Sequence, residues 1–248
     1  MFLYYVGSLG PPATRCQVSR YGVYHQSMPR TYRLKHRAER QDETRQRIVE
    51  AAVELHQTVG PAATTVSEIA ERAGVGRVTV YRHFPDELTL IRACSGLYLE
   101  RHPLPDPERW REIPDPVERF RTALRDVYAY HRATESMFTH VLADARDHEV
   151  MTPYHAHWQR AADVLVAPWQ ARGRRRTLLH AGIGLALSFD TWRSLVRDHG
   201  LTDDQAIAVA LRLVGDTPGP GESASLATAE ADDSVARHQK PPPTEASS

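Results

Sequence analysis

The sequence predicts an all-α fold, in which a group of short helices is followed by a longer helical region. Through most of the chain, apolar residues recur at the i, i+3, i+4, i+7 spacing that places them on one helical face. Glycine, proline and side chains suited to helix caps separate these stretches. No convincing stretch shows the strict apolar–polar alternation that is typical of a half-buried β-strand.

The composition is that of an ordinary globular protein. The chain has 248 residues, of which 41% are hydrophobic and 25% charged, with a formal net charge of +0. Cys16 and Cys94 are too few for a disulfide framework or a cysteine metal cluster. No apolar run reaches the roughly 18 residues of a membrane span. We therefore expect a cytoplasmic protein that binds no cofactor, no metal and no membrane.

Both ends of the chain lack an apolar helical face. Residues 1–40 are predicted to form a disordered basic arm, because basic side chains crowd between Arg30 and Arg40, and Met28 is an alternative first residue. Residues 216–248 carry 6 acidic and 2 basic side chains among many Pro, Ser and Ala. Such a segment cannot bury enough apolar surface to offset its ordering entropy, so a disordered acidic tail is predicted.

The segment 41–90 contains three short helices with clear boundaries. Asp42 can cap a first helix that ends at Gly60 and has one apolar side, made of Ile48, Ala51, Ala52, Leu55 and Val59. Thr65 and Glu68 have the spacing of a capping box, in which each side chain satisfies the other residue's backbone N–H. A second helix therefore begins there.

A tight turn joins the second helix to the third. Gly74 supplies the backbone freedom that this turn needs, and a helix from about Arg77 to His83 follows. Val80 and Phe84 lie four apart and face the core, while Asp86 caps a fourth helix. Two short helices joined by such a turn, with a third packed behind them, form a helix-turn-helix module, which indicates DNA binding.

The exposed side of the third helix suits entry into a major groove about 12 Å wide. Its residues are small or polar, with one long arginine. They are Gly76, Arg77, Val78, Thr79, Tyr81 and His83.

The whole segment resembles the N-terminal domain of the TetR family without a gap. The residues that carry the resemblance are Thr44–Leu55, Gly60, Thr64–Val66, Glu68–Ala70, Ala73–Gly76 and Thr79–Phe84. The resemblance implies that Thr65, Tyr81 and His83 contact phosphate, while Arg77, Val78 and Thr79 face base edges. Two positions depart from the pattern. His56 stands where an aromatic core residue is usual, and Glu87 stands where a phosphate-binding lysine is common.

Residues 91–215 are predicted to form a helical ligand-binding and dimerisation domain. Five prolines between His102 and Pro116 mark the joint before it, and Asp115 caps its first helix. Further helices are expected at Ser136–Asp147, Pro153–Ala171, Arg174–His199 and Asp203–Val214.

Aromatic residues on these helices are first of all core residues. The resemblance implies that some of them also line a pocket for an unidentified small-molecule effector. The candidates are Phe120, Tyr128, Phe138, Trp158 and Phe189.

Together these features predict a ligand-released repressor that binds double-stranded DNA at an inverted-repeat operator as a homodimer. The last two predicted helices, with Gly182 and Gly184, would form the dimer interface. No nucleophile–base motif indicates catalysis, so no enzyme activity is expected. Two alternatives remain: a metalloenzyme using the His and Asp residues between Asp144 and His157, and a DNA-binding protein without ligand control.

Overall fold

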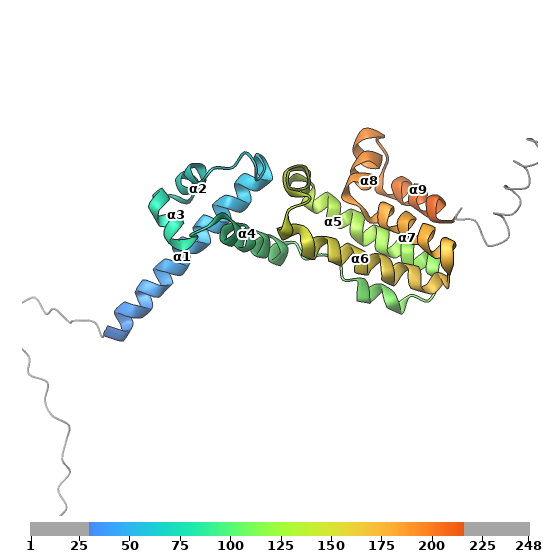
Figure 1. Cartoon of the computed structure of the whole chain (residues 1–248), viewed down its shortest axis with the longest axis horizontal. Helices are drawn as coiled ribbons and strands as arrows, with labels where there is room; N and C mark the ends of the chain where they lie inside the picture. Colours follow the sequence, from blue (N-terminus) through green and yellow to red (C-terminus); the bar gives the residue numbers. More distant parts are fainter. Residues whose placement is uncertain (1–29, 216–248) are drawn as a thin grey trace, which may run out of the picture. The chain divides into compact units, whose positions relative to one another are not determined.

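The computed structural model describes residues 30–215, and within that range every regular element is a helix or a helical turn (Figure 1). None of these helices is both long and apolar enough to cross a lipid bilayer. The elements are α1 (Arg30–Thr58), α2 (Val66–Ala73), α3 (Arg77–His83), α4 (Glu87–Arg101), η1 (Pro107–Glu112), α5 (Pro116–Ala145), η2 (Glu149–Met151), α6 (Thr152–Val166), η3 (Ala167–Trp169), α7 (Gly173–Leu187), α8 (Phe189–Arg193), η4 (Ser194–Asp198) and α9 (Asp203–Gly215).

The predicted disordered arm is wrong for residues 30–40, because α1 begins at Arg30. This stretch has no apolar face, but its Arg, Lys, Glu and Ala residues have high intrinsic helix propensity. Within it, Lys35 Nζ lies 4.0 Å from a Glu39 carboxylate oxygen, an i,i+4 pair that supports a helix. The described residues up to Thr44 belong to one compact unit, and those from Arg45 onward belong to another. The remaining parts of the predicted arm and tail, 1–29 and 216–248, lie outside the described residues.

The second half of α1 supplies the core of the first helical group. Ile48 and Ala52 are completely buried, as the apolar spacing predicts. Val59 is an exception, with 47% of its surface exposed, because the helix ends at Thr58 and the chain turns away there. The predicted boundary between residues 90 and 91 falls inside α4, which continues to Arg101.

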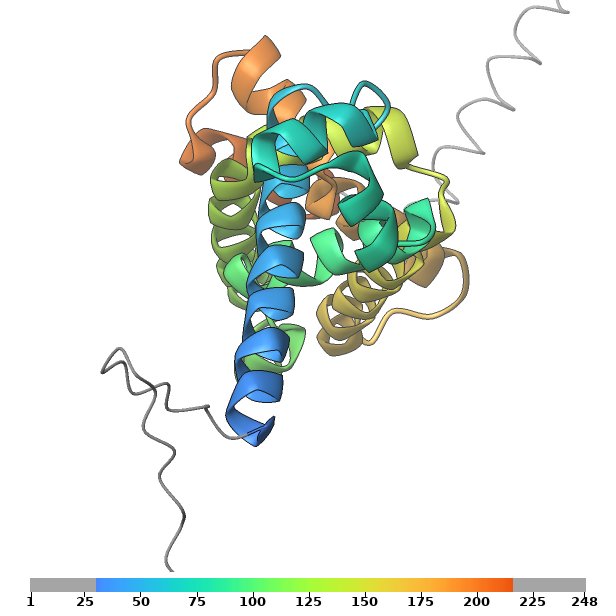
Figure 2. The same ribbon diagram turned by 90° about the vertical axis from the view of Figure 1, so that its left-hand side faces the viewer.

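One long helix, α5, runs through the second helical group where two helices were predicted. Asp115 caps it by accepting the backbone N–H of Glu118 at 2.7 Å. No proline or glycine interrupts it before Ala145, so the separate helix expected at Ser136–Asp147 is its continuation. In Figure 1 α5, α6 and α7 lie alongside one another, and Figure 2 shows the same ribbon turned by 90°.

The helix predicted at Arg174–His199 is divided in the structure. Ser188 adopts an extended conformation, and its hydroxyl accepts the backbone N–H of Thr191 at 3.1 Å, so α7 ends and α8 begins there. A π-helical turn, η4, follows. Trp192 is fully buried, and its indole N–H donates to Asp203 at 3.1 Å, which fixes the start of α9.

Candidate nucleic-acid interface and adjoining cavity

The turn between α2 and α3 is fixed by backbone hydrogen bonds. Gly74 has a φ of +65°, in the left-handed region that favours glycine. Its N–H donates to the Glu71 carbonyl at 3.1 Å, and the next N–H, of Val75, donates to the Ala70 carbonyl at 2.9 Å. These two bonds form a Schellman motif, which ends α2 and directs the chain into α3.

The start of α2 is equally well defined. The predicted capping box is confirmed, since the Thr65 hydroxyl accepts the N–H of Glu68 at 3.2 Å and the Glu68 carboxylate accepts the N–H of Thr65 at 2.8 Å. The same hydroxyl donates to Glu68 at 2.7 Å, and this bond lowers the pKa of the Glu68 carboxyl. Thr65 is exposed, so its hydroxyl would have to exchange Glu68 for a phosphate in order to donate to DNA.

Two arginines of α1 bind the carboxyl ends of α2 and α3. Arg47 Nη1 donates to the Ala73 carbonyl at 3.2 Å, and Arg45 Nη1 donates to the His83 carbonyl at 3.3 Å. A cation at the end of a helix interacts favourably with its dipole and satisfies a carbonyl without a helical partner. Both short helices are therefore anchored to α1.

The recognition helix α3 has one buried face and one exposed face. Val80 and Phe84 are 1% and 2% exposed, as predicted. Val78 and Tyr81 are 80% and 56% exposed, so both side chains are accessible to a partner. No acidic residue occurs between Gly74 and Pro85. The exposed face is therefore free of negative charge that would repel a phosphate backbone.

The structure brings most of the predicted DNA-contacting residues onto this face. Gly76, Arg77, Val78 and Tyr81 are exposed, whereas Thr79 and His83 are half-buried. The predicted set omits Arg82, which is also exposed and adds a second arginine to the helix.

A cavity of about 420 Å³ lies next to this module. Its walls come from α1 and α4, from the loop between α1 and α2, and from α5, η2 and α6. Most of the lining is apolar, including Ile91, Tyr98, Met137, Phe138 and Tyr154. The volume is within the range of small-molecule sites in proteins.

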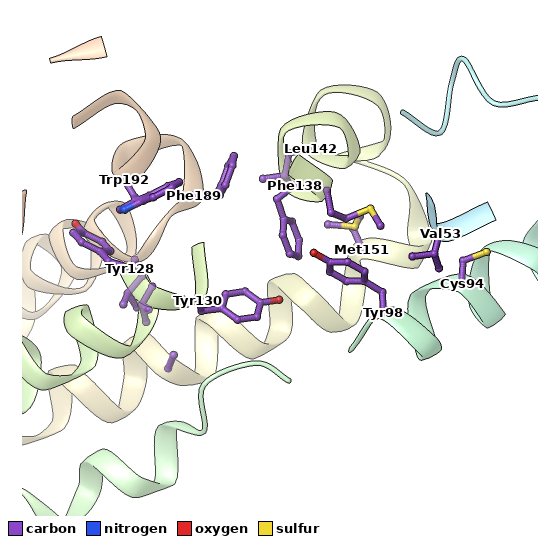
Figure 3. Close-up of a cluster of buried hydrophobic side chains, with 14 of the residues drawn as sticks. Val53, Cys94, Tyr98, Tyr128, Tyr130, Phe138, Leu142, Met151, Phe189 and Trp192 are labelled. Atoms are coloured by element: carbon purple, nitrogen blue, oxygen red, sulfur yellow. The ribbon is translucent and has the colours of Figure 1, made fainter. Parts of the chain in front are cut away.

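Of the five aromatic residues predicted to line an effector pocket, Phe138 lies on the wall of this cavity. Trp158 and Phe189 do not line it, although the Phe189 ring lies 6.1 Å from that of Phe138. Phe120 and Tyr128 are fully buried core residues. Figure 3 shows Tyr98 and Phe138 facing each other from separate elements, with Tyr128 and Trp192 in a different part of the cluster.

Several cavity residues were not among the predicted candidates. Tyr98 and Tyr154 come from α4 and α6, and burial raises the pKa of each phenol to about 12. Cys94 also lines the cavity, and burial raises the pKa of its thiol to about 12, so it stays protonated. His56 and Glu87, the two departures from the family pattern, lie on the same wall.

The metalloenzyme alternative finds no support in residues 30–215. Within that range no group of three or more His, Cys, Asp or Glu residues is placed to hold a metal ion. His148 Nδ1 instead accepts the N–H of Val150 at 3.2 Å, and His155 Nε2 lies 3.0 Å from the Arg146 carbonyl. The histidines between Asp144 and His157 therefore do not converge on one point.

The fold and the exposed recognition helix define a helix-turn-helix DNA-binding regulator. Residues 48–94 match the family described as "Bacterial regulatory proteins, tetR family". The chain is 30% identical over 154 residues to "Probable HTH-type transcriptional regulator ArpR" of Pseudomonas putida, covering 60% of this chain and 67% of that protein. It is 29% identical over 177 residues to the regulator TtgR of the same species, covering 70% of this chain and 77% of that protein.

The chain therefore belongs to the TetR family, whose members matched here are transcriptional regulators and not enzymes. A shorter match, 43% identical over 63 residues, joins it to the P. putida regulator SrpR and covers 25% of this chain and 29% of that protein. Among solved structures, the multidrug binding protein EbrR complexed with imidazole is similar, with a TM-score of 0.42 and 22% identity over 83% of this chain and 100% of that one.

Proposed function

We propose that this regulator is a repressor, which binds an inverted-repeat operator as a homodimer and is released by a small-molecule effector. Arg77, Val78 and Thr79 read base edges, and Tyr81, His83 and Thr65 contact phosphates. Gly76, which has open space around it, allows close approach of the DNA backbone. In a bacterium such a protein acts in the cytoplasm, where the operator lies.

The observation that carries ligand control is the position of the cavity. Helices α1 and α4 of the helix-turn-helix module form one side of it, and α5, η2 and α6 form the other. A ligand there contacts both groups of helices at once. An effector shifts the equilibrium between two conformations only if it binds one of them more tightly than the other. When the two groups of helices move, the shape of a site that they share changes, so its affinity for a ligand can differ between the two conformations.

The dimer is supported by exposed apolar residues on the last helices. Leu178 and Leu185 on α7 are 44% and 53% exposed, and Val209 and Leu213 on α9 are 42% and 49% exposed. Other apolar residues of these helices, such as Ile183 and Ile207, are buried in the core of the subunit itself. An exposed stripe of this kind suits a two-fold interface, in which one patch meets its own copy.

Selection of bound fragments from a random DNA pool tests the proposal. We expect an inverted repeat whose half-sites lie about one helical turn apart or a multiple of it. Compounds are then screened for release of the selected fragment. If the protein binds DNA without sequence preference, the proposal that it recognises an operator is wrong. If it binds a specific site and no compound releases it from that site, the alternative of a DNA-binding protein without ligand control is favoured.

A further inference from the structure

The cavity beside the helix-turn-helix module has a polar end and an aromatic end. Along α4, Glu87 and Tyr98 both line it, and eleven residues of helix separate them by about 16 Å. Along α5, Phe138 and Asp144 line it. The rings of Tyr98 and Phe138 are 6.4 Å apart, which places them at one end, while Asp144 meets the loop between α1 and α2 at the other.

The polar end carries the carboxylates of Glu87 and Asp144. Within the described part of the chain, no ion pair within 4.0 Å joins Glu87 or Asp144 to an Arg, Lys or His. Burial lowers the pKa of His56 although the nearby Glu87 carboxylate acts in the opposite direction, so the neutral imidazole is favoured. Arg92 also lines the cavity, but its guanidinium lies 3.8 Å from a Glu149 carboxylate oxygen, which offsets its charge.

The aromatic end offers an apolar surface. Tyr98, Phe138 and Tyr154 contribute their rings, and the Phe138 and Tyr154 rings stack with centres 5.0 Å apart. Met137 and Met151 complete it with flexible thioethers, which adapt to ligands of irregular shape. A ligand that satisfies both ends has an apolar body and one positively charged group.

Asp144 links the polar end to the DNA-binding module. Its Oδ2 atom accepts the backbone N–H of Ala62 at 3.0 Å, in the loop between α1 and α2. The contact is tight, because a Cβ atom on Gly60 would lie 2.7 Å from the same oxygen, and Gly60 has a φ of +91°. A cation that binds this carboxylate competes with the Ala62 N–H for it.

We propose that this cavity binds an organic cation with an apolar body, whose charged group lies between Glu87 and Asp144 and weakens the bond from Ala62 to Asp144. The first part, the ligand class, depends only on the cavity. The second part rests on the proposed function, because it assigns the route by which the ligand changes the module that binds DNA.

Calorimetry on the full chain without DNA tests the ligand class. Three probes share one apolar body and differ in the terminal group: 4-phenylbutylammonium, 4-phenylbutanol and 4-phenylbutyrate. We expect the ammonium to bind about tenfold more tightly than the alcohol, since hydrogen bonds to charged groups are the stronger ones. The carboxylate should bind most weakly. Equal affinity of the three probes, or no binding of the ammonium, overturns the assignment.

Matched variants locate the charged group. Glu87→Gln keeps the size of the side chain and removes its charge, so the affinity for the ammonium should fall towards that for the alcohol, which should not change. Glu100→Gln removes a charge from an exposed position of the same helix outside the cavity and should leave both affinities unchanged. An ammonium affinity that Glu87→Gln leaves intact contradicts the proposed position.

Asp144→Asn tests the route, because asparagine keeps an oxygen for the Ala62 N–H but carries no charge. On a DNA site selected by the protein, the ammonium probe should weaken binding by about fivefold or more in the native chain. In Asp144→Asn, DNA affinity without the probe should be retained and the response to the probe lost. A full response in this variant overturns the route. If no DNA site is selected at all, the proposed function fails, and the calorimetry still decides the ligand class.

Discussion

The Arg45 guanidinium lies over the ring of Phe84, with its carbon 4.2 Å from the ring centre. The same guanidinium donates to the carbonyl of His83, the last residue of α3. One side chain of α1 therefore holds the end of the recognition helix by a cation–π contact and by a hydrogen bond.

Replacing Arg45 with methionine keeps much of its apolar length and removes both interactions. We expect the free energy of unfolding to fall by about 1–2 kcal/mol, the usual size of a cation–π contact and a partly buried hydrogen bond together. Urea denaturation measures this. The neighbouring Gln46→Met is the control, because Gln46 is exposed and, among the described residues, its side chain donates to Glu50 of the same helix. Equal losses in the two variants would show that Arg45 does not anchor α3.

Arg77→Ala tests how the recognition helix reads sequence. A bidentate contact from arginine to guanine is worth about 1–3 kcal/mol, so specific affinity should fall by that amount. The preference at one position of each half-site should also relax, which repeated selection from a random pool detects. Unchanged affinity together with an unchanged selected sequence would mean that Arg77 does not face the bases.

Tyr81→Phe removes a hydroxyl that we assign to a phosphate. Because phosphate contacts carry no sequence information, binding to all DNA sequences should weaken by a similar factor. The ratio of specific to non-specific affinity, measured at one salt concentration, should stay constant. A change in that ratio would place Tyr81 against a base instead.

The exposed stripe on α7 and α9 predicts how the dimer can be broken. Leu185→Glu and Leu213→Glu each place a charge in a two-fold apolar interface, so light scattering at micromolar concentration should give a monomer. Val117→Glu is the matched control, since Val117 is an apolar residue of α5, outside α7 and α9, that is 40% exposed. A native chain that is already monomeric would refute the dimer.

The stability of the protein should depend on pH through His131. This side chain is completely buried, and burial lowers its pKa to about 4, whereas an unfolded histidine titrates near 6.5. Its Nε2 atom lies 2.9 Å from the Leu187 carbonyl, which can only accept, so Nε2 carries the proton of the neutral ring. Below pH 6.5 the unfolded chain binds a proton that the folded chain does not.

Stability therefore falls as the pH drops from about 6.5 to about 4. The loss from this residue should reach about 2 kcal/mol at pH 5 relative to pH 7.5. The glutamine of His131→Gln can still donate to the Leu187 carbonyl but does not titrate. A plot of the free energy of unfolding against pH should therefore fall by about 2 kcal/mol less for this variant than for the native chain. His56 and His157, whose pKa values burial also lowers, contribute equally to both curves. Parallel curves would contradict the assignment.

Local signals account for what the sequence predicted well. The capping box of Thr65 and Glu68, the turn at Gly74 and the cap at Asp115 depend on residues within a few positions of one another. The exposed face of α3 followed from the spacing of Val80 and Phe84. Such short-range geometry can be predicted from the sequence because it depends on the same few neighbouring atoms in any protein.

Other features depended on contacts or propensities that apolar spacing does not register. The first turns of α1 have no continuous apolar face, so only the helix propensity of their residues indicated a helix. The apolar pattern continues through Ser188, where a single hydroxyl cap divides the predicted helix. The walls of the cavity come from segments as far apart as His56 and Tyr154, and their meeting depends on how the helices dock.

Because α5 is unbroken, it fixes the distance and the relative orientation of two contacts that it makes with other parts of the chain. Arg132 forms a two-pronged pair with Asp203 of α9 at 2.7 and 3.0 Å, and Asp144, about 18 Å further along the helix, holds Ala62. Each added residue would turn the second attachment by about 100° relative to the first. Insertions between Arg132 and Asp144 should therefore uncouple the two ends, whereas insertions in the loops at 102–106 and 146–148 leave this spacing along α5 unchanged. Chimaeric regulators assembled from relatives should accordingly be joined in those loops, with α5 taken whole from one parent.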